Sequence, residues 1–99
     1  MSQSYESAVV PVSAPAATRS VVVPVDLHAR PAGLLARTAA GFSAVVTVAA
    51  GERCANGRSV LEVMGLGATA GTAVTVRAEG ADAEAAVTAL AELLAAVEA

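Results

Sequence analysis

The sequence has very few aromatic residues, no lysine, and only one cysteine and one histidine. A single cysteine cannot form a disulfide within the chain, so nothing in the sequence indicates an oxidising compartment. One cysteine and one histidine also supply too few ligands for a structural zinc site, which needs about four. Six arginines against nine acidic residues give a net charge of −3, so we expect no metal site and no nucleic-acid-binding patch.

The apolar residues are small and form no long run. They make up 56% of the 99 residues, and almost half of them are alanine. No apolar stretch approaches the ~20 residues that span a bilayer, and the N-terminus lacks the basic and apolar regions of a secretory signal. A chain of this length forms one domain. We expect a cytoplasmic protein, without membrane insertion, whose core consists of valine and leucine on closely packed elements.

Two regions of the chain differ in composition. Residues 1–17 mix serine, alanine and two prolines without a sustained period, which predicts a flexible N-terminal leader. A short additional strand formed by Val9, Val10 and Val12 is the alternative. Residues 18–99 carry alternating and helical apolar patterns and are predicted to form the folded domain.

The patterns in the folded domain predict four strands and three helices. Pro24 ends the first strand, Gly41 ends the first helix as a C-terminal cap, and Asp82 caps the last helix. In chain order the predicted elements are a strand at 18–23, a helix at 29–40, strands at 45–50 and 53–55, a short helix opened by residues 59–62 that ends near Gly65 or Gly67, a strand at 73–78 and a helix from 83 to the region of Val97. This order favours an α/β (α+β) open-faced sandwich, with a four-stranded, mainly antiparallel sheet and three helices on one face.

The only histidine lies directly before the first predicted helix. Pro31 fits the first turn of a helix, where a missing N–H costs nothing, so His28 stands at or just before the helix N-terminus. The helix N-terminus at Ala29 to Ala32 carries free amides, and with the guanidinium of Arg30 it forms a site suited to an anion, for which phosphate is the obvious candidate. A nucleophilic imidazole beside such a site suggests a histidine that is itself phosphorylated.

The hexapeptide Leu27–Ala32, Leu-His-Ala-Arg-Pro-Ala, resembles the active-site signature of the histidine-containing phosphocarrier protein (HPr) family of the bacterial phosphoenolpyruvate-dependent sugar phosphotransferase system. The resemblance extends from about Ser20 to Val97, and it implies the same βαββαβα order. It also implies that His28 is phosphorylated on Nδ1 by enzyme I, which draws the group from phosphoenolpyruvate, and that a histidine of a sugar-specific enzyme IIA receives it. Such a protein is a carrier and not an enzyme, needs no cofactor, and is expected to be a monomer.

Other functions fit parts of this pattern. A regulatory or side-branch phosphocarrier, in a nitrogen-related or dihydroxyacetone kinase phosphorelay, shares the chemistry but not the pathway. A non-catalytic interaction module would keep its function in a His28→Ala variant. A small catalytic domain is the weakest alternative, because only Asp26 is available to pair with His28.

Asp26 is the clearest departure from the family pattern, which has glycine just before the Leu-His pair. Aspartate tolerates tight turns better than most residues. Its charge, two residues from His28, either favours a protonated imidazole or repels incoming phosphate. The efficiency of transfer is therefore in question at this position.

Ser59 has two interpretations. Ser59 and Glu62 form the Ser-x-x-Glu pattern of a capping box, in which the hydroxyl and the carboxylate each bond a backbone amide. The resemblance implies a second role, because a dedicated serine kinase phosphorylates the serine at this place in many family members. The cap is the interpretation that the residues themselves favour.

The short helix that Ser59 opens carries a dense apolar cluster. Its members are Val60, Leu61, Val63, Met64 and Leu66. Some of them must enter the core. We expect Val60, Leu61, Met64 and Leu66 to form an apolar docking face for partners near His28.

Overall fold

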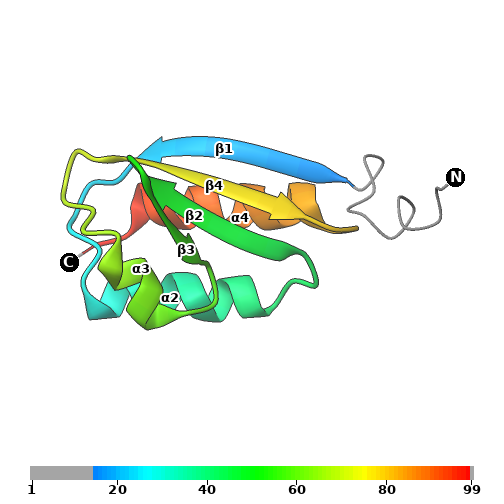
Figure 1. Cartoon of the computed structure of the whole chain (residues 1–99), viewed down its shortest axis with the longest axis horizontal. Coiled ribbons are helices and arrows are strands. Elements are labelled where there is room, and N and C mark those ends of the chain that lie inside the picture. The colour runs from blue at the N-terminus through cyan, green and yellow to red at the C-terminus, as the bar shows by residue number, and fades with distance from the viewer. Residues whose placement is uncertain (1–14, 99) are drawn as a thin grey trace, which may run out of the picture.

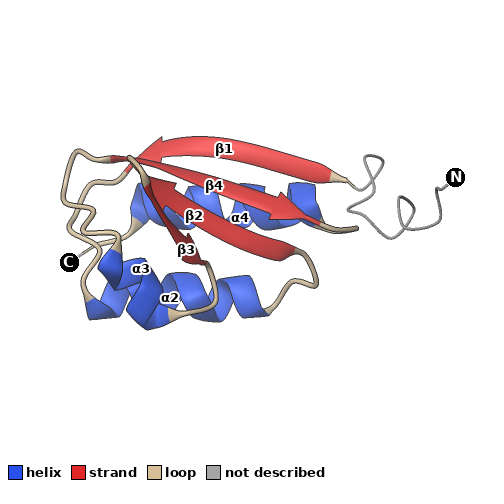
Figure 2. Ribbon diagram, in the orientation of Figure 1, coloured by secondary structure: helices blue, strands red, loops and turns tan. Residues whose placement is uncertain are grey.

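The computed structural model describes residues 15–98 and contains four strands and three helices. In chain order these are β1 (Ala16–Val22), α2 (Ala29–Ala40), β2 (Val45–Ala50), β3 (Arg53–Asn56), α3 (Val60–Gly65), β4 (Ala73–Glu79) and α4 (Ala83–Ala96). The strands form one antiparallel sheet in the order β1-β4-β2-β3, and the helices cover one of its faces (Figures 1 and 2). The predicted open-faced sandwich is confirmed.

The first strand begins earlier than predicted. Ala16 and Ala17 pair with Glu79 and Ala78 of β4, so the partner strand draws into the sheet two residues that were assigned to the leader. The strand ends at Val22, and the buried Val23 follows it. Residues 1–14 of the predicted leader, which include the alternative strand of Val9, Val10 and Val12, lie outside the described residues.

Alternation and helical periodicity place the core as expected. In β4 the side chains of Val74, Val76 and Ala78 are fully buried, whereas Arg77 is exposed. Alanines and leucines make up most of the buried faces of α2 and α4, and α4 packs against β1 and β4. The largest fully buried side chains are Leu35, Leu90, Leu94, Val23, Val48, Val63, Val74, Val76 and Val87.

Both predicted helix-cap residues stand at the predicted helix ends, but the side chain of Asp82 binds elsewhere. Asp82 is the N-cap residue of α4, but its carboxylate makes no bond to that helix. It accepts hydrogen bonds from the backbone amides of Ser43 and Ala44 and from the Ser43 hydroxyl, and these bonds, led by the one from the Ser43 amide, hold the pKa of Asp82 below 3.8. Gly41 ends α2 with a right-handed φ of −80°, and its amide bonds the Thr38 carbonyl. The prediction that Gly41 is the C-terminal cap of α2 is therefore confirmed.

Candidate functional site

His28 is the N-cap residue of α2, so the predicted start of this helix at Ala29 is confirmed. Its carbonyl accepts the Ala32 amide at 3.0 Å, and its own amide donates to the Asp26 carbonyl at 2.9 Å. The imidazole makes no capping hydrogen bond, and the side chain is 80% exposed. The backbone of His28 is therefore fixed, while its ring faces solvent and is accessible to a partner.

The N-terminus of α2 offers two unpaired amides. Within residues 15–98, the amides of Ala29 and Arg30 have no hydrogen-bond partner. Pro31 has no N–H, and the Ala32 amide is already bonded to His28. The first turn contains no acidic residue, so the positive end of the helix dipole is not neutralised locally. Among the residues predicted to bind an anion, Ala29 and Arg30 are therefore the two whose backbone amides are free in the described chain.

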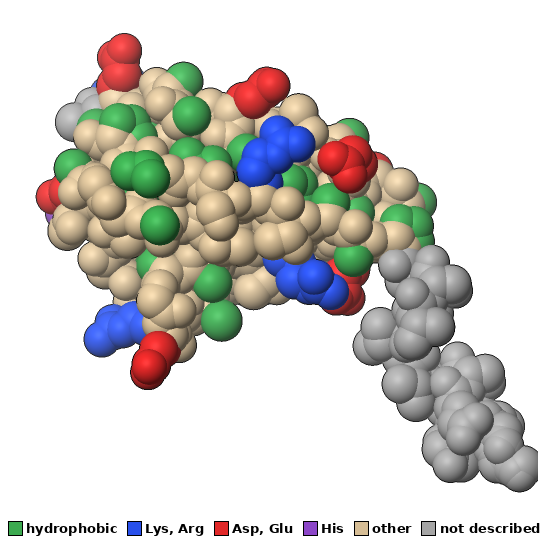
Figure 3. Space-filling model, turned by 90° about the horizontal axis from the view of Figure 1, so that it is seen from above, with side chains coloured by type: hydrophobic (Ala, Val, Ile, Leu, Met, Phe, Trp, Pro, Cys, Tyr) green, Lys and Arg blue, Asp and Glu red, His purple; other side chains and the backbone are tan. Residues whose placement is uncertain are grey.

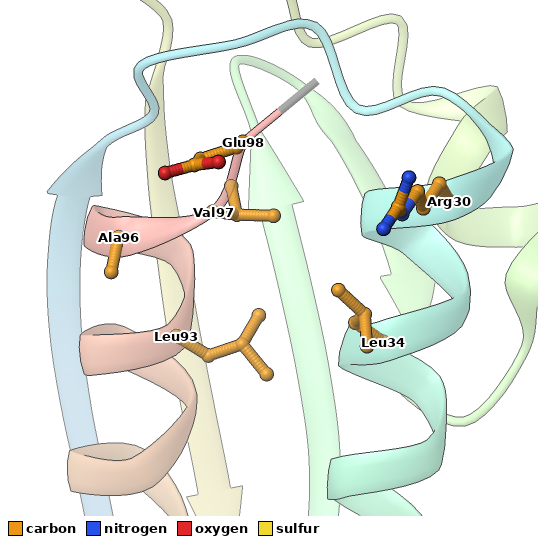
Figure 4. Close-up of a pocket in the computed structure, with 6 residues that line it drawn as sticks. All are labelled: Arg30, Leu34, Leu93, Ala96, Val97 and Glu98. Atoms are coloured by element: carbon orange, nitrogen blue, oxygen red, sulfur yellow. The ribbon is translucent and has the colours of Figure 1, made fainter.

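Arg30 is an exposed cation in that first turn. The described part of the chain holds no ion pair for it, and a cation at a helix N-terminus is disfavoured unless an anion lies nearby. Its side chain lines an open pocket of about 450 Å³ between the start of α2 and the end of α4, and the Glu98 carboxylate on the far wall points away from it (Figure 4). The other residues that line the pocket are Leu34, Leu93, Ala96 and Val97.

Asp26 connects the loop before α2 to the loop before β4. Its Oδ1 accepts the Ala70 amide at 2.8 Å, and its Oδ2 lies 3.5 Å from His28 Nε2. The backbone of the two loops is also joined, because the Leu27 amide donates to the Ala68 carbonyl at 3.0 Å. The sequence pointed to Asp26 as a charge near His28, and the structure shows where that charge is held.

The loop around Ala70 belongs to this site, although the sequence does not predict it. Gly67 and Gly71 flank the loop with φ of 68° and 92°, values that favour glycine. The Gly71 amide donates to the Val23 carbonyl at 2.8 Å. The two glycines were the available signal, but they do not indicate which distant residue the loop would bind.

Only part of the predicted docking face is exposed in the structure. Leu61 is 81% exposed and Met64 is 37% exposed, and we call these two residues the α3 surface. Val60 is half-buried against the core, and Val63 is fully buried. Leu66 follows the end of α3 and is only 5% exposed, so its assignment to the docking face is wrong. Helix α3, which carries this surface, packs against α2 and lies beside the N-terminal half of the helix that His28 caps (Figure 1).

Ser59 is confirmed as the N-cap of α3, since its Oγ accepts the Glu62 amide at 3.1 Å. The capping box also predicts that the Glu62 carboxylate accepts the Ser59 amide, and this part of the prediction is wrong. Glu62 Oε1 accepts the Asn56 amide at 2.8 Å, while the Ser59 amide donates to the Asn56 carbonyl. The carboxylate therefore ties α3 to β3 rather than to its own cap.

Several other kinds of site find no support in residues 15–98. No helix there is long and apolar enough to cross a membrane, and no three side chains of the metal-binding types lie together. On the face seen in Figure 3, arginine and acidic side chains are interspersed with neutral surface and form no basic patch.

Comparison with known proteins agrees with this geometry. The model of the family described as "PTS HPr component phosphorylation site" matches residues 16–96. Phosphocarrier protein HPr of Mycoplasma capricolum is 42% identical over 66 residues, which are 67% of this chain and 74% of that protein. Phosphocarrier protein HPr of Lysinibacillus sphaericus is 41% identical over 75 residues, which are 76% of this chain and 85% of that protein. The crystal structure of HPr from Bacillus anthracis matches with a TM-score of 0.75 and 32% identity, and the match covers 80% of this chain and 96% of that one.

The matched range includes the whole sheet, all three described helices and the segment around His28. The sequence identity and the fold similarity both point to phosphocarrier proteins HPr. The chain therefore belongs to the HPr family of phosphocarrier proteins of the phosphotransferase system.

Proposed function

We propose that this protein accepts a phosphoryl group on His28 from phosphorylated enzyme I, which obtains the group from phosphoenolpyruvate, and passes it to a histidine of a sugar-specific enzyme IIA. The observation that carries the proposal is an exposed imidazole at the N-cap of α2, next to two unpaired amides in the described chain. Arg30 adds an unneutralised cation in the same turn.

The arrangement suits reversible transfer. A phosphoryl group on imidazole is a high-energy adduct, so it must be stabilised enough to persist between partners but not so much that it cannot leave. The Ala29 and Arg30 amides supply fixed donors, and the Arg30 guanidinium supplies a planar cation that can bind two phosphoryl oxygens. These groups hold the cargo, and each partner supplies the rest of the positioning, so the protein acts as a carrier and not as an enzyme.

The proposal is tested by incubating the protein with phosphoenolpyruvate and enzyme I. The expected result is a mass gain of one phosphate that acid removes and that is absent in His28→Ala. The variant Arg77→Ala, which changes an arginine on the exposed face of β4, is the control and gains the phosphate normally. A phosphorylated His28→Ala variant, or an unphosphorylated wild-type protein, refutes the proposal.

The pathway is tested separately. Because Asp26 departs from the family pattern, a nitrogen-related or dihydroxyacetone kinase phosphorelay is the alternative to the sugar pathway. Parallel assays with the enzyme I and acceptor proteins of each system distinguish these pathways. The sugar pathway predicts the fastest transfer with the sugar-specific pair, in a protein that acts as a monomer in the cytoplasm. If His28→Ala retains full function in cells, the protein is an interaction module instead.

We assign Ser59 a structural role first, because its hydroxyl caps α3. A phosphate on this hydroxyl would lie near the Glu62 carboxylate, and the two negative charges repel. A serine kinase of phosphocarrier proteins is therefore expected to modify Ser59 poorly. The check is the mass of the protein after incubation with that kinase and ATP, with Ser59→Ala as the blank.

A further inference from the structure

We propose that Asp26 is a positioning residue that keeps the proton of the His28 imidazole on Nε2 and so leaves the lone pair of Nδ1 free to accept the phosphoryl group. The inference rests on the proposed function and adds one residue to it. Its structural basis is the placement of the two Asp26 oxygens, one bonded to the Ala70 amide and the other 3.5 Å from Nε2.

Two hydrogen bonds fix the position of the Asp26 carboxylate, one to the carboxylate itself and one between the two loops. The Ala70 amide binds Oδ1 at 2.8 Å, and the joined backbones of Leu27 and Ala68 fix the distance between the two loops. Only glycines have a positive φ among residues 15–98, so Asp26 is not needed there for a left-handed turn. The side chain, and not the backbone, therefore accounts for an aspartate at this position.

A neutral imidazole carries one N–H and one lone pair, and the partner of one nitrogen decides which nitrogen keeps the proton. A carboxylate only accepts hydrogen bonds, so a carboxylate facing Nε2 favours the tautomer with the proton on Nε2. The separation of 3.5 Å is longer than a hydrogen bond, as is common in catalytic pairs before a partner docks and the contact tightens.

The two ring nitrogens face different surroundings. Nδ1 is bonded to Cγ and lies nearer to the backbone than Nε2, and the backbone at His28 leads directly into the unpaired amides of Ala29 and Arg30. Nε2 is the nitrogen that the Asp26 carboxylate approaches. Attack through Nδ1 thus puts the phosphoryl group on the ring nitrogen that the negative carboxylate does not approach.

The transfer step balances with this assignment. The Nδ1 lone pair forms the new N–P bond, while the bond between phosphorus and the donor's leaving atom breaks and its electron pair stays on that atom. No proton has to leave the imidazole, since Nε2 carried it from the start. The ring becomes positively charged, and the Asp26 carboxylate beside Nε2–H stabilises that charge until the phosphoryl group leaves.

The variant Asp26→Asn separates positioning from loop anchoring. It retains an oxygen to accept the Ala70 N–H, but it places an NH₂ donor toward Nε2, which favours the tautomer with the proton on Nδ1. The isosteric variant Glu92→Gln, on the exposed face of α4, removes the same charge from a residue that takes no part in the contacts of Asp26 and is the matched control. The readouts are the ¹⁵N chemical shifts of the two ring nitrogens at a pH where the imidazole is neutral, the phosphorylation rate with enzyme I, and the Tm.

In the wild-type protein and in Glu92→Gln we expect the proton mainly on Nε2. In Asp26→Asn we expect a shift of the proton toward Nδ1, a loss of kcat of about 10- to 100-fold with little change in KM, and an unchanged Tm. Equal tautomer populations in the wild-type protein and Asp26→Asn overturn the inference, as does a loss of rate that accompanies only a lower Tm. A wild-type protein that enzyme I does not phosphorylate refutes the proposed function, and the tautomer measurement still stands because it needs no enzyme I.

Discussion

Leu61 and Leu66 allow a sharp test of the α3 surface, because the same substitution on two neighbouring leucines should have opposite consequences. Leu61 is 81% exposed on α3, whereas Leu66 is 5% exposed just after it. If partners dock on the α3 surface, Leu61→Ala weakens docking and leaves folding intact. Leu66→Ala weakens folding and leaves docking intact in the folded fraction.

The magnitudes follow from the exposed area. Leucine has three more carbon atoms than alanine, and burying each is worth about 0.8 kcal/mol, so full burial of a side chain that is 81% exposed contributes about 2 kcal/mol. That free energy corresponds to an increase of about 25-fold in KM for the partner, and burial of half the side chain corresponds to about 5-fold. For Leu66→Ala the expected loss is about 2–5 kcal/mol of unfolding free energy, from the removed contacts and the cavity left behind.

Two assays distinguish these outcomes. Steady-state phosphorylation with enzyme I gives KM and kcat, and urea unfolding gives the free energy of unfolding. Leu61→Ala should change stability by less than about 0.5 kcal/mol and should raise KM with kcat nearly constant. If KM is unchanged in Leu61→Ala, the α3 surface is not the docking site. If Leu66→Ala raises KM as much at a temperature where it is fully folded, burial does not decide which leucine partners contact.

Three further predictions follow from the geometry. Arg30→Ala should slow phosphorylation about 10- to 100-fold, the effect of losing charge-assisted hydrogen bonds to phosphate, with partial rescue in Arg30→Lys and no loss in Arg77→Ala; an unchanged rate would exclude Arg30 from the site. The pKa of Asp82 is lowered below 3.8 in the folded protein, so its stabilisation is present above the unfolded pKa and is lost as the pH falls through the folded pKa. At neutral pH the Tm of Asp82→Asn should therefore be lower than that of the wild-type protein, and it should fall less as the pH decreases. An equal fall of Tm in both proteins would contradict this role of Asp82. A Cβ on Gly57 would lie 2.5 Å from a side-chain carbon of β2, so Gly57→Ala should cost about 1–3 kcal/mol in urea unfolding, whereas Gly65→Ala, with open space around it, should not.

The elements of this fold were predictable where local chemistry decides them. The alternation of Val74, Val76 and Ala78 predicts β4 because only a strand buries every second residue, and the structure buries all three. Pro31 and His28 predict the start of α2 because proline fits only its first turn. Errors are confined to strand ends such as Ala16, where pairing with β4 and not local preference sets the limit.

The contacts of polar side chains were not predictable, because they depend on segments far apart in the sequence. Asp82 was expected to cap its own helix, but its acceptors are used by Ser43 and Ala44, which are 39 and 38 residues away. Leu66 was grouped with exposed neighbours because a short helix gives too few turns to define its buried face. Leu66 is the C-cap residue of α3, and the direction of the backbone at this helix end places its side chain in the core.

The role of Asp26 depends both on its place in the sequence next to His28 and on a contact with a distant segment. From the sequence, a carboxylate two residues before His28 either attracts a proton to the imidazole or repels phosphate, and these effects have opposite consequences for transfer. A bond to the Ala70 amide, 44 residues away, fixes the carboxylate on the Nε2 side of the ring. In the proposed transfer it attracts the proton at the nitrogen that does not react, and the amides of Ala29 and Arg30 remain free to bind the phosphoryl group. On this proposal, the charge whose effect the sequence leaves open assists transfer in the fold.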